Sequence, residues 1–296
     1  MKNVTKILTA VVLCAAVFAS TQRVNALGGN AAFWPGDEAN ITNFPAQINN
    51  HGYLQVTNMD GAGHVDMVFS NGGANWSFGY NNDSDEWFDI GWGKDGMGLN
   101  IAMTASDDGT GTTSDGFVLS FGKDLGENGE LGLVYTSGDD SGTDWNDNGF
   151  ELHYRKSCGF WIFTDMVAMV DSPDDGEMTI DVDMFTHMDA GAADVMYAMG
   201  VWNNDGSMKL TANVGVEAAV TDAVTLRGGL EWDYDLSNDN DTTGSNHTWT
   251  TGLGFNMGSF TADLGLTQSF WDNPMGFVTG NDDSVTWGDV TVTYSF

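Results

Sequence analysis

Apolar residues alternate with polar residues or glycine along most of the chain, from residue 52 to the C-terminus. In 210–218 and in 290–296, for example, every second residue is Leu, Ala, Val, Tyr or Phe. A period of two is that of a β-strand with two different faces. The alternating segments are roughly 8–13 residues long, close to the length that a tilted strand needs to cross a bilayer. The pattern therefore predicts an all-β protein, an antiparallel up-and-down transmembrane β-barrel.

The connections between these segments alternate between long and tight. Residues 272–283 and 236–246 are long, whereas 257–259 and 221–222 are tight, and a further turn is predicted at Ser157-Cys158. Outer-membrane barrels show this asymmetry, with short periplasmic turns and longer external loops. Counting the alternating segments from the C-terminus back to residue 52 gives about sixteen strands. An even number of strands leaves both ends of the barrel in the periplasm. Fourteen strands are the alternative, because the first four candidates are short: 53–59, 64–70, 74–81 and 86–93.

A soluble β-sandwich would show the same period with its apolar face turned inward. The alternation of loop lengths favours the membrane instead. Backbone polar groups in lipid must be satisfied within the protein, and a sheet achieves this by closing into a barrel. We therefore assign 52–296 to the transmembrane barrel.

The first residues have the pattern of a secretory leader. Lys2 and Lys6 precede an apolar run over 7–19, and Val24-Asn25-Ala26 fits a small-x-Ala cleavage site. The run is too short to span a bilayer as a helix. We expect residues 1–26 to be a signal peptide that is removed after export. Residues 27–51 would then form a periplasmic N-terminal segment or a hatch.

The C-terminal residues carry a resemblance to a known class. Val290, Val292 and Tyr294 alternate with polar residues and lead to a terminal Phe296. This ending resembles the closing strand of Gram-negative outer-membrane β-barrel proteins of the porin-like kind. The resemblance implies that the chain is inserted in the bacterial outer membrane, after export through the periplasm, by the barrel assembly machinery acting on Phe296.

A second resemblance concerns the segment before the barrel. Gly36-Asp37-Glu38-Ala39, followed by Asn43-Phe44-Pro45-Ala46-Gln47-Ile48, resembles the N-terminal segment of the long-chain fatty acid transporter type of barrel. Phe44 interrupts the Asn-Pro pair of that family. The resemblance implies a fourteen-strand barrel with this segment folded inside as a hatch. A surface turn before the first strand is the alternative.

Acidic side chains dominate the face opposite the apolar one. If apolar residues face lipid, the other face lines the lumen, where carboxylates attract cations and repel anions. The predicted pore-lining residues are Asp66, Asp89, Glu151, Asp181, Asp183, Glu217, Glu231, Asp233, Asp263 and Asp289, together with Arg155, Lys209 and Arg227. Glycines on this face, such as Gly229 and Gly252, would leave room inside. The same residues would also suit a plugged lumen with solvated acids.

The whole chain is strongly acidic, with 42 Asp and Glu against 9 Lys and Arg and a formal net charge of -33. Such a surface repels phosphate backbones, so nucleic-acid binding is excluded. The expected partners are outer-membrane lipid, lipopolysaccharide, and small solutes or cations; no oligomeric interface can be read from the sequence. Two loops partly match a calcium-binding pattern of alternating oxygen ligands, at Asp144, Asn146 and Asn148 and at Asp239 and Asp241. Solvated loop acidity is the other interpretation, and no other cofactor is indicated.

Nothing in the sequence predicts an enzyme. The five histidines are scattered and no Gly-x-Ser-x-Gly elbow or His-Glu-x-x-His motif occurs. The favoured function is passive diffusion of small hydrophilic solutes, with a preference for cations. The alternatives are an uptake channel for hydrophobic small molecules with an N-terminal hatch, and a closed barrel with a structural or adhesive role through its acidic loops.

Overall fold

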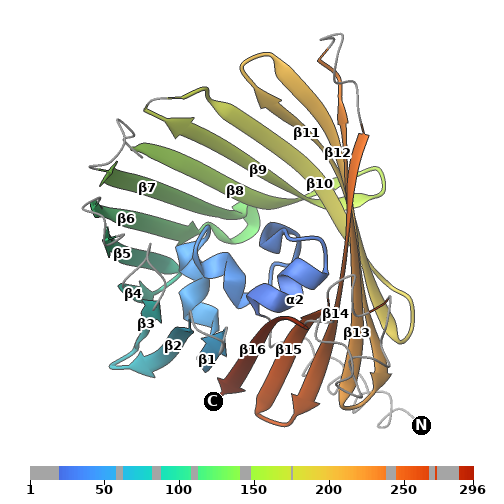
Figure 1. Cartoon of the computed structure of the whole chain (residues 1–296), viewed down its shortest axis with the longest axis horizontal. Coiled ribbons are helices and arrows are strands. Elements are labelled where there is room, and N and C mark those ends of the chain that lie inside the picture. Colours follow the sequence, from blue (N-terminus) through green and yellow to red (C-terminus); the bar gives the residue numbers. More distant parts are fainter. Residues whose placement is uncertain are drawn as a thin grey trace.

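The strands form one closed barrel (Figure 1). The computed structural model describes residues 20–57, 63–81, 88–107, 113–140, 148–174, 176–237, 245–266, 271 and 287–296. The strands are β1 (Tyr53–Thr57), β2 (His64–Asn71), β3 (Ala74–Asn81), β4 (Phe88–Lys94), β5 (Met97–Asp107), β6 (Thr113–Asp124), β7 (Glu130–Asp140), β8 (Gly149–Phe160), β9 (Phe163–Pro173), β10 (Thr179–Asp189), β11 (Ala193–Asn204), β12 (Ser207–Thr221), β13 (Val224–Asp235), β14 (Ser245–Met257), β15 (Phe260–Leu266) and β16 (Trp287–Ser295). The prediction of sixteen strands is confirmed, and the alternative of fourteen is wrong.

Every strand pairs antiparallel with its neighbours in the chain, and β1 closes the ring against β16. The closing pair runs in register from Tyr53 opposite Ser295 to Thr57 opposite Thr291. Closure leaves no strand edge exposed, which is what backbone hydrogen bonding in a bilayer requires.

Alternation along each strand separates two faces. On β12, Val214 is exposed while its neighbours Asn213 and Gly215 are buried. Large apolar side chains on the outer face keep much of their surface uncovered, as Trp249 does at 71% exposed. An apolar outer surface around a closed sheet is the architecture of outer-membrane barrels.

The turn expected at Ser157-Cys158 is displaced. Strand β8 continues to Phe160, and the turn is formed by Trp161 and Ile162. The pairing of β8 with β9 shifts register between Ser157 and Phe160. Because of this irregularity, the alternation of residues in the sequence does not show where the strand ends.

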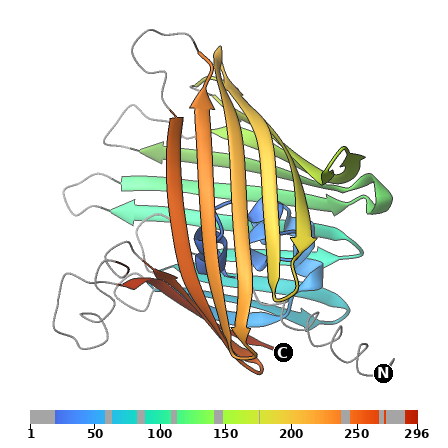
Figure 2. The same cartoon turned by 90° about the vertical axis from the view of Figure 1, so that its right-hand side faces the viewer.

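The N-terminal segment lies inside the ring of strands (Figures 1 and 2). It contains α2 (Thr21–Ala26) and three 3-10 helices, η1 (Ala31–Phe33), η2 (Glu38–Ile41) and η3 (Pro45–Asn50); a further one, η4 (Gly126–Asn128), lies between β6 and β7. No helix in the described part of the chain combines the length and the apolar character needed to cross a membrane. Helix α2, which falls within the predicted leader, contacts β13 to β16. Removal of residues 1–26 stays a prediction.

Candidate functional site: a hatch in the barrel lumen

Residues 27–51, called the hatch from here on, pack against an apolar patch on the inner wall. Leu27, Ala32, Phe33, Trp34 and Phe44 of the hatch form one buried cluster with the wall. The wall contributes Val167 of β9, Phe185 of β10, and Met196 and Ala198 of β11. The rings of Phe33 and Phe185 lie 5.5 Å apart and are almost fully buried. Burial of each such ring contributes about 1.5–3 kcal/mol to holding the hatch.

Arg155 of β8 connects the hatch to the wall through several contacts at once. Its Nη1 donates to the carbonyl oxygen of Ala32 at 2.7 Å and to Asn40 Oδ1 at 3.0 Å. Its guanidinium lies 4.5 Å from the centre of the Phe44 ring. On the wall it pairs with Glu130 of β7, to which Nε donates at 2.7 Å. A buried cation with this many partners fixes the hatch in one position.

Polar contacts hold the hatch at several points along its length. Near its start, His187 Nε2 lies 2.7 Å from the carbonyl oxygen of Phe33, and the His187 ring packs edge-on against Trp34. In its middle, Glu38 Oε1 accepts a hydrogen bond from Gln55 of β1 at 2.9 Å. Gln47 also donates to the carboxylate of Glu130. The hatch is therefore attached to the wall around much of the ring.

Four glycines make a row across the inner wall beneath η3. Gly93 of β4, Gly98 of β5, Gly122 of β6 and Gly132 of β7 are successive register partners. A Cβ atom on Gly98, Gly122 or Gly132 would stand less than 3.0 Å from hatch backbone atoms of Pro45, Ala46 or Asn43. This glycine row lets the hatch backbone lie directly on the strand backbones.

Helix α2 adds charged contacts to the opposite wall. Arg23 pairs with Asp37 of the hatch at 2.8 Å and with Glu217 of β12 at 2.6 Å. Ser20 Oγ donates to Asp263 of β15 at 2.8 Å. These contacts all depend on residues of the predicted leader.

Burial shifts two titratable groups of the N-terminal segment. It raises the pKa of Asp37 to about 6, although Arg23 beside it pulls that pKa down. Burial lowers the pKa of His51 to about 4, because a charged imidazole would lose its hydration there. His51 Nε2 has no hydrogen-bond partner among the described residues.

Two of the three basic residues predicted to line the pore, Lys209 and Arg227, are paired with acids from the same set, whereas Arg155 pairs with Glu130 outside it. Arg227 bonds to Glu217 at 2.8 Å and to Asp263 at 2.6 Å. Lys209 Nζ lies 3.6 Å from Asp233. The charges of these two side chains and of Arg155 are therefore neutralised by neighbouring carboxylates. The remaining carboxylates make the lumen acidic.

The other predicted acids lie on the same inner face. Asp183 accepts a hydrogen bond from Thr211, and Glu151 lies 2.8 Å from His153 Nε2. Asp181 is two positions from Asp183 on β10, and its Oδ1 is buried without a hydrogen-bond partner in the described part of the chain. Glu231 is the register partner of the inward Asn213. That these residues line a permeation path stays a prediction.

Asp66 and Asp89 line a cavity of about 170 Å³ between η2 and strands β1 to β6. The side chain of Asp289 lies outside the described residues. So do Asp144, Asn146, Asp239 and Asp241 of the predicted calcium loops. Of that set only Asn148 is described, and its carbonyl accepts from the Asp174 amide.

The sequence did not reveal the inward apolar patch or the glycine row. Phe185 and Met196 occupy inward positions of the period-two pattern, where polar residues were expected. These two large apolar residues at inward positions were the signal in the sequence that another segment of the chain packs inside the barrel. Gly229 and Gly252, expected to leave room, are instead approached closely by Gly28 and Ala26.

The chain resembles several solved barrels. BamA from Haemophilus ducreyi lacking POTRA domains 1–3 aligns over 82% of this chain and 70% of that one, with 9% identity and a TM-score of 0.48. CdiB from Escherichia coli aligns over 83% of this chain and 62% of that one, with 13% identity and a TM-score of 0.44. The Acinetobacter baumannii outer membrane protein Omp33 aligns over 84% of this chain and 100% of that one, with 9% identity and a TM-score of 0.36. No family model and no curated protein matches the chain.

Proposed function

We propose that the protein is a bacterial outer-membrane channel whose lumen is gated by the hatch and which passes small hydrophilic solutes with a preference for cations. The observation that carries the proposal is the hatch itself, a separate segment clamped in the lumen by side chains of the wall. A barrel needed only as a structural support would not require an internal segment held by so many wall side chains.

The charge of the inner wall supports cation preference. Arg155, Lys209 and Arg227 are each paired with wall carboxylates, while Asp66, Asp89 and Asp181 face the inside in addition to those pairs. An excess of carboxylates around a narrow aqueous path raises the local concentration of cations.

Removal of the leader would change the lumen. A cut after Ala26 takes away α2 and its contacts with β13 to β16, and it leaves the hatch in contact with β1 and with strands from β3 to β13. The volume vacated beside β14 to β16 would be the permeation path. This channel is passive and requires no catalytic residue.

Single-channel recording of the mature protein in planar bilayers, with asymmetric KCl, tests the proposal. We expect Arg155→Met to raise the open fraction, because it removes the bonds to Ala32 and Asn40 that hold the hatch. Lys209→Met is the matched control, since it also removes one inner-wall cation but one that pairs with Asp233. An anion-selective reversal potential, or no conductance in either variant, would reject the proposal.

A second function is favoured by the apolar patch. Val167, Phe185, Met196 and Ala198 would be uncovered inside the lumen if the hatch moved away. Such a surface suits an uptake channel for hydrophobic small molecules. Uptake of a fluorescent fatty acid by cells, lost in Phe185→Asp and kept in Lys209→Met, would favour this function over the aqueous channel.

The third function, a closed barrel with acidic surface loops, predicts no solute flux. Liposome swelling separates it from the first, because a closed barrel gives no swelling.

Insertion into the membrane would depend on the C-terminal end of the chain in each case. Phe296 is 64% exposed, and its amide donates to the Gly52 carbonyl beside the closing strand. This position leaves the ring accessible to the assembly machinery.

A further inference from the structure

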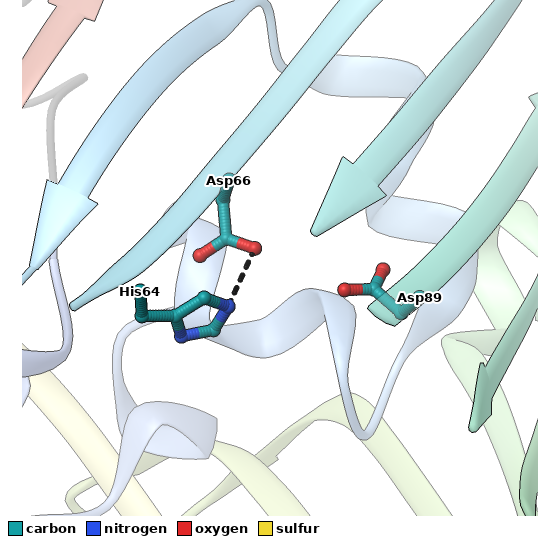
Figure 3. Close-up of side chains that lie close together, drawn as sticks. All are labelled: His64, Asp66 and Asp89. Carbon is teal, nitrogen blue, oxygen red and sulfur yellow. Dashed lines mark ion pairs between the residues drawn. The ribbon is translucent and has the colours of Figure 1, made fainter. Parts of the chain in front are cut away.

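Three side chains with metal-binding atoms converge on the inner wall of the barrel. They are His64 and Asp66 of β2 and Asp89 of β4, and they line the cavity between η2 and strands β1 to β6 (Figure 3). One ligand atom from each lies within 4.8 Å of the other two, and His64 Nε2 is 3.0 Å from Asp66 Oδ1.

The register of the sheet brings the two carboxylates together. Asp66 and Asp89 are both partners of Gly79, which lies on β3 between them. A Cβ on Gly79 would stand 2.8 Å from Asp66 Oδ1 and even closer to Asp89 Oδ2. The missing side chain is therefore what allows both carboxylates to bend over the same point. Two carboxylates that approach one point attract a cation to that point.

The cavity gives an independent indication of a ligand. The three side chains line the cavity of about 170 Å³, together with Glu38 of η2 and Ser77 of β3. Ser77 is only 8% exposed, and its Oγ has no hydrogen-bond partner among the described residues. The space accommodates an ion with water molecules, and the hydroxyl is placed to bond to such water.

One imidazole and two carboxylates select a class of ion. Calcium and magnesium take oxygen ligands, whereas an imidazole nitrogen favours a borderline divalent ion such as Zn²⁺. We propose that His64, Asp66 and Asp89 bind one divalent ion of the zinc class, with water completing the coordination. The site does not depend on channel activity, so it stands or falls separately from the proposed function.

The test is zinc binding by the purified, detergent-solubilised full chain after treatment with a chelator. Calorimetry with ZnCl₂, and metal analysis after gel filtration, should give one Zn²⁺ per chain and no comparable binding of Ca²⁺. We expect His64→Gln and Asp89→Asn each to weaken binding by at least about tenfold. Asp194→Asn is the matched control, because Asp194 pairs with His187 at 3.1 Å and belongs to no such cluster among the residues that the structure describes.

A variant that keeps all three ligands makes the test sharper. Gly79→Ala places a methyl group between the two carboxylates and should abolish binding, whereas Gly228→Ala, whose nearest neighbouring atom lies 4.0 Å away, should not. If a variant fails to fold, Co²⁺ bound to the unaltered protein should still show the visible spectrum of a tetrahedral site with nitrogen and oxygen ligands. No zinc binding by the unaltered chain, or equal binding by Asp89→Asn and Asp194→Asn, would overturn the proposal.

Discussion

A methyl group added to the glycine row should open the hatch. In Gly132→Ala the new Cβ would stand less than 3.0 Å from the carbonyl oxygen of Asn43. Its neighbours there are hatch backbone atoms, including Phe44 Cα, so no flexible side chain can rotate away. An ordinary carbon–oxygen contact needs about 3.3 Å or more. The hatch backbone must therefore withdraw from β7.

The size of the effect follows from the cost of overpacking. Inserting one methyl group into a well-packed contact costs about 1–3 kcal/mol. Only the closed state, with the hatch on the wall, bears this cost. The ratio of open to closed channels should therefore rise by about 5- to 150-fold.

Single-channel recording measures that ratio directly, and limited proteolysis of the hatch checks it. Gly228→Ala is the control, since it makes the same substitution on β13 where the nearest atom is 4.0 Å from the new Cβ. Heat-modifiable migration on gels shows that both barrels are folded. If Gly132→Ala and Gly228→Ala have the same open fraction and the same proteolysis rate, the hatch is not held against the glycine row as described.

Three further outcomes are expected. Phe44→Ala should weaken the attachment of the hatch by about 3–5 kcal/mol, because a fully buried ring is lost, and proteolysis within the hatch should accelerate accordingly. Acidification should loosen the segment around His51, because the pKa of His51 is lowered to about 4 in the folded protein. The folded segment therefore keeps its full stability above about pH 6.5 and loses stability as the pH falls towards about 4. The total loss of stability is at most about 3 kcal/mol. The rate of proteolysis should rise between pH 7 and 5 in the unaltered protein, and it should rise less in His51→Gln. The raised pKa of Asp37 has the opposite effect on stability, but it is present in both proteins and does not change the comparison. Intact mass of the protein from outer membranes should match a chain that begins at Leu27, and a retained Arg23 would contradict the predicted leader.

The barrel was predictable because its physical cause is local. A strand in lipid must place an apolar residue at every second position, so the period appears directly in segments such as 210–218. The lengths of the turns indicated the number of strands, and a register shift between Ser157 and Phe160 accompanies the displaced turn between β8 and β9. The inward acids followed from the same alternation.

The site was only partly predictable. The resemblance of 36–48 to a known hatch indicated an internal segment, but not what it would contact. Phe185 meets Phe33 from more than a hundred residues away, and Arg155 meets Asn40 in the same manner. No local pattern encodes such distant pairs.

The sequence by itself therefore determined the membrane-spanning sheet, the direction of its two faces and the acidity of the lumen. Tertiary structure alone decided which wall residues the hatch contacts, that four glycines from four strands form one row, and that Asp66 and Asp89 meet over Gly79. The physical reason is register. Alternation decides which face a side chain occupies, whereas its neighbours across the sheet depend on how each strand is aligned with the next, and that alignment is set when the barrel closes around its contents.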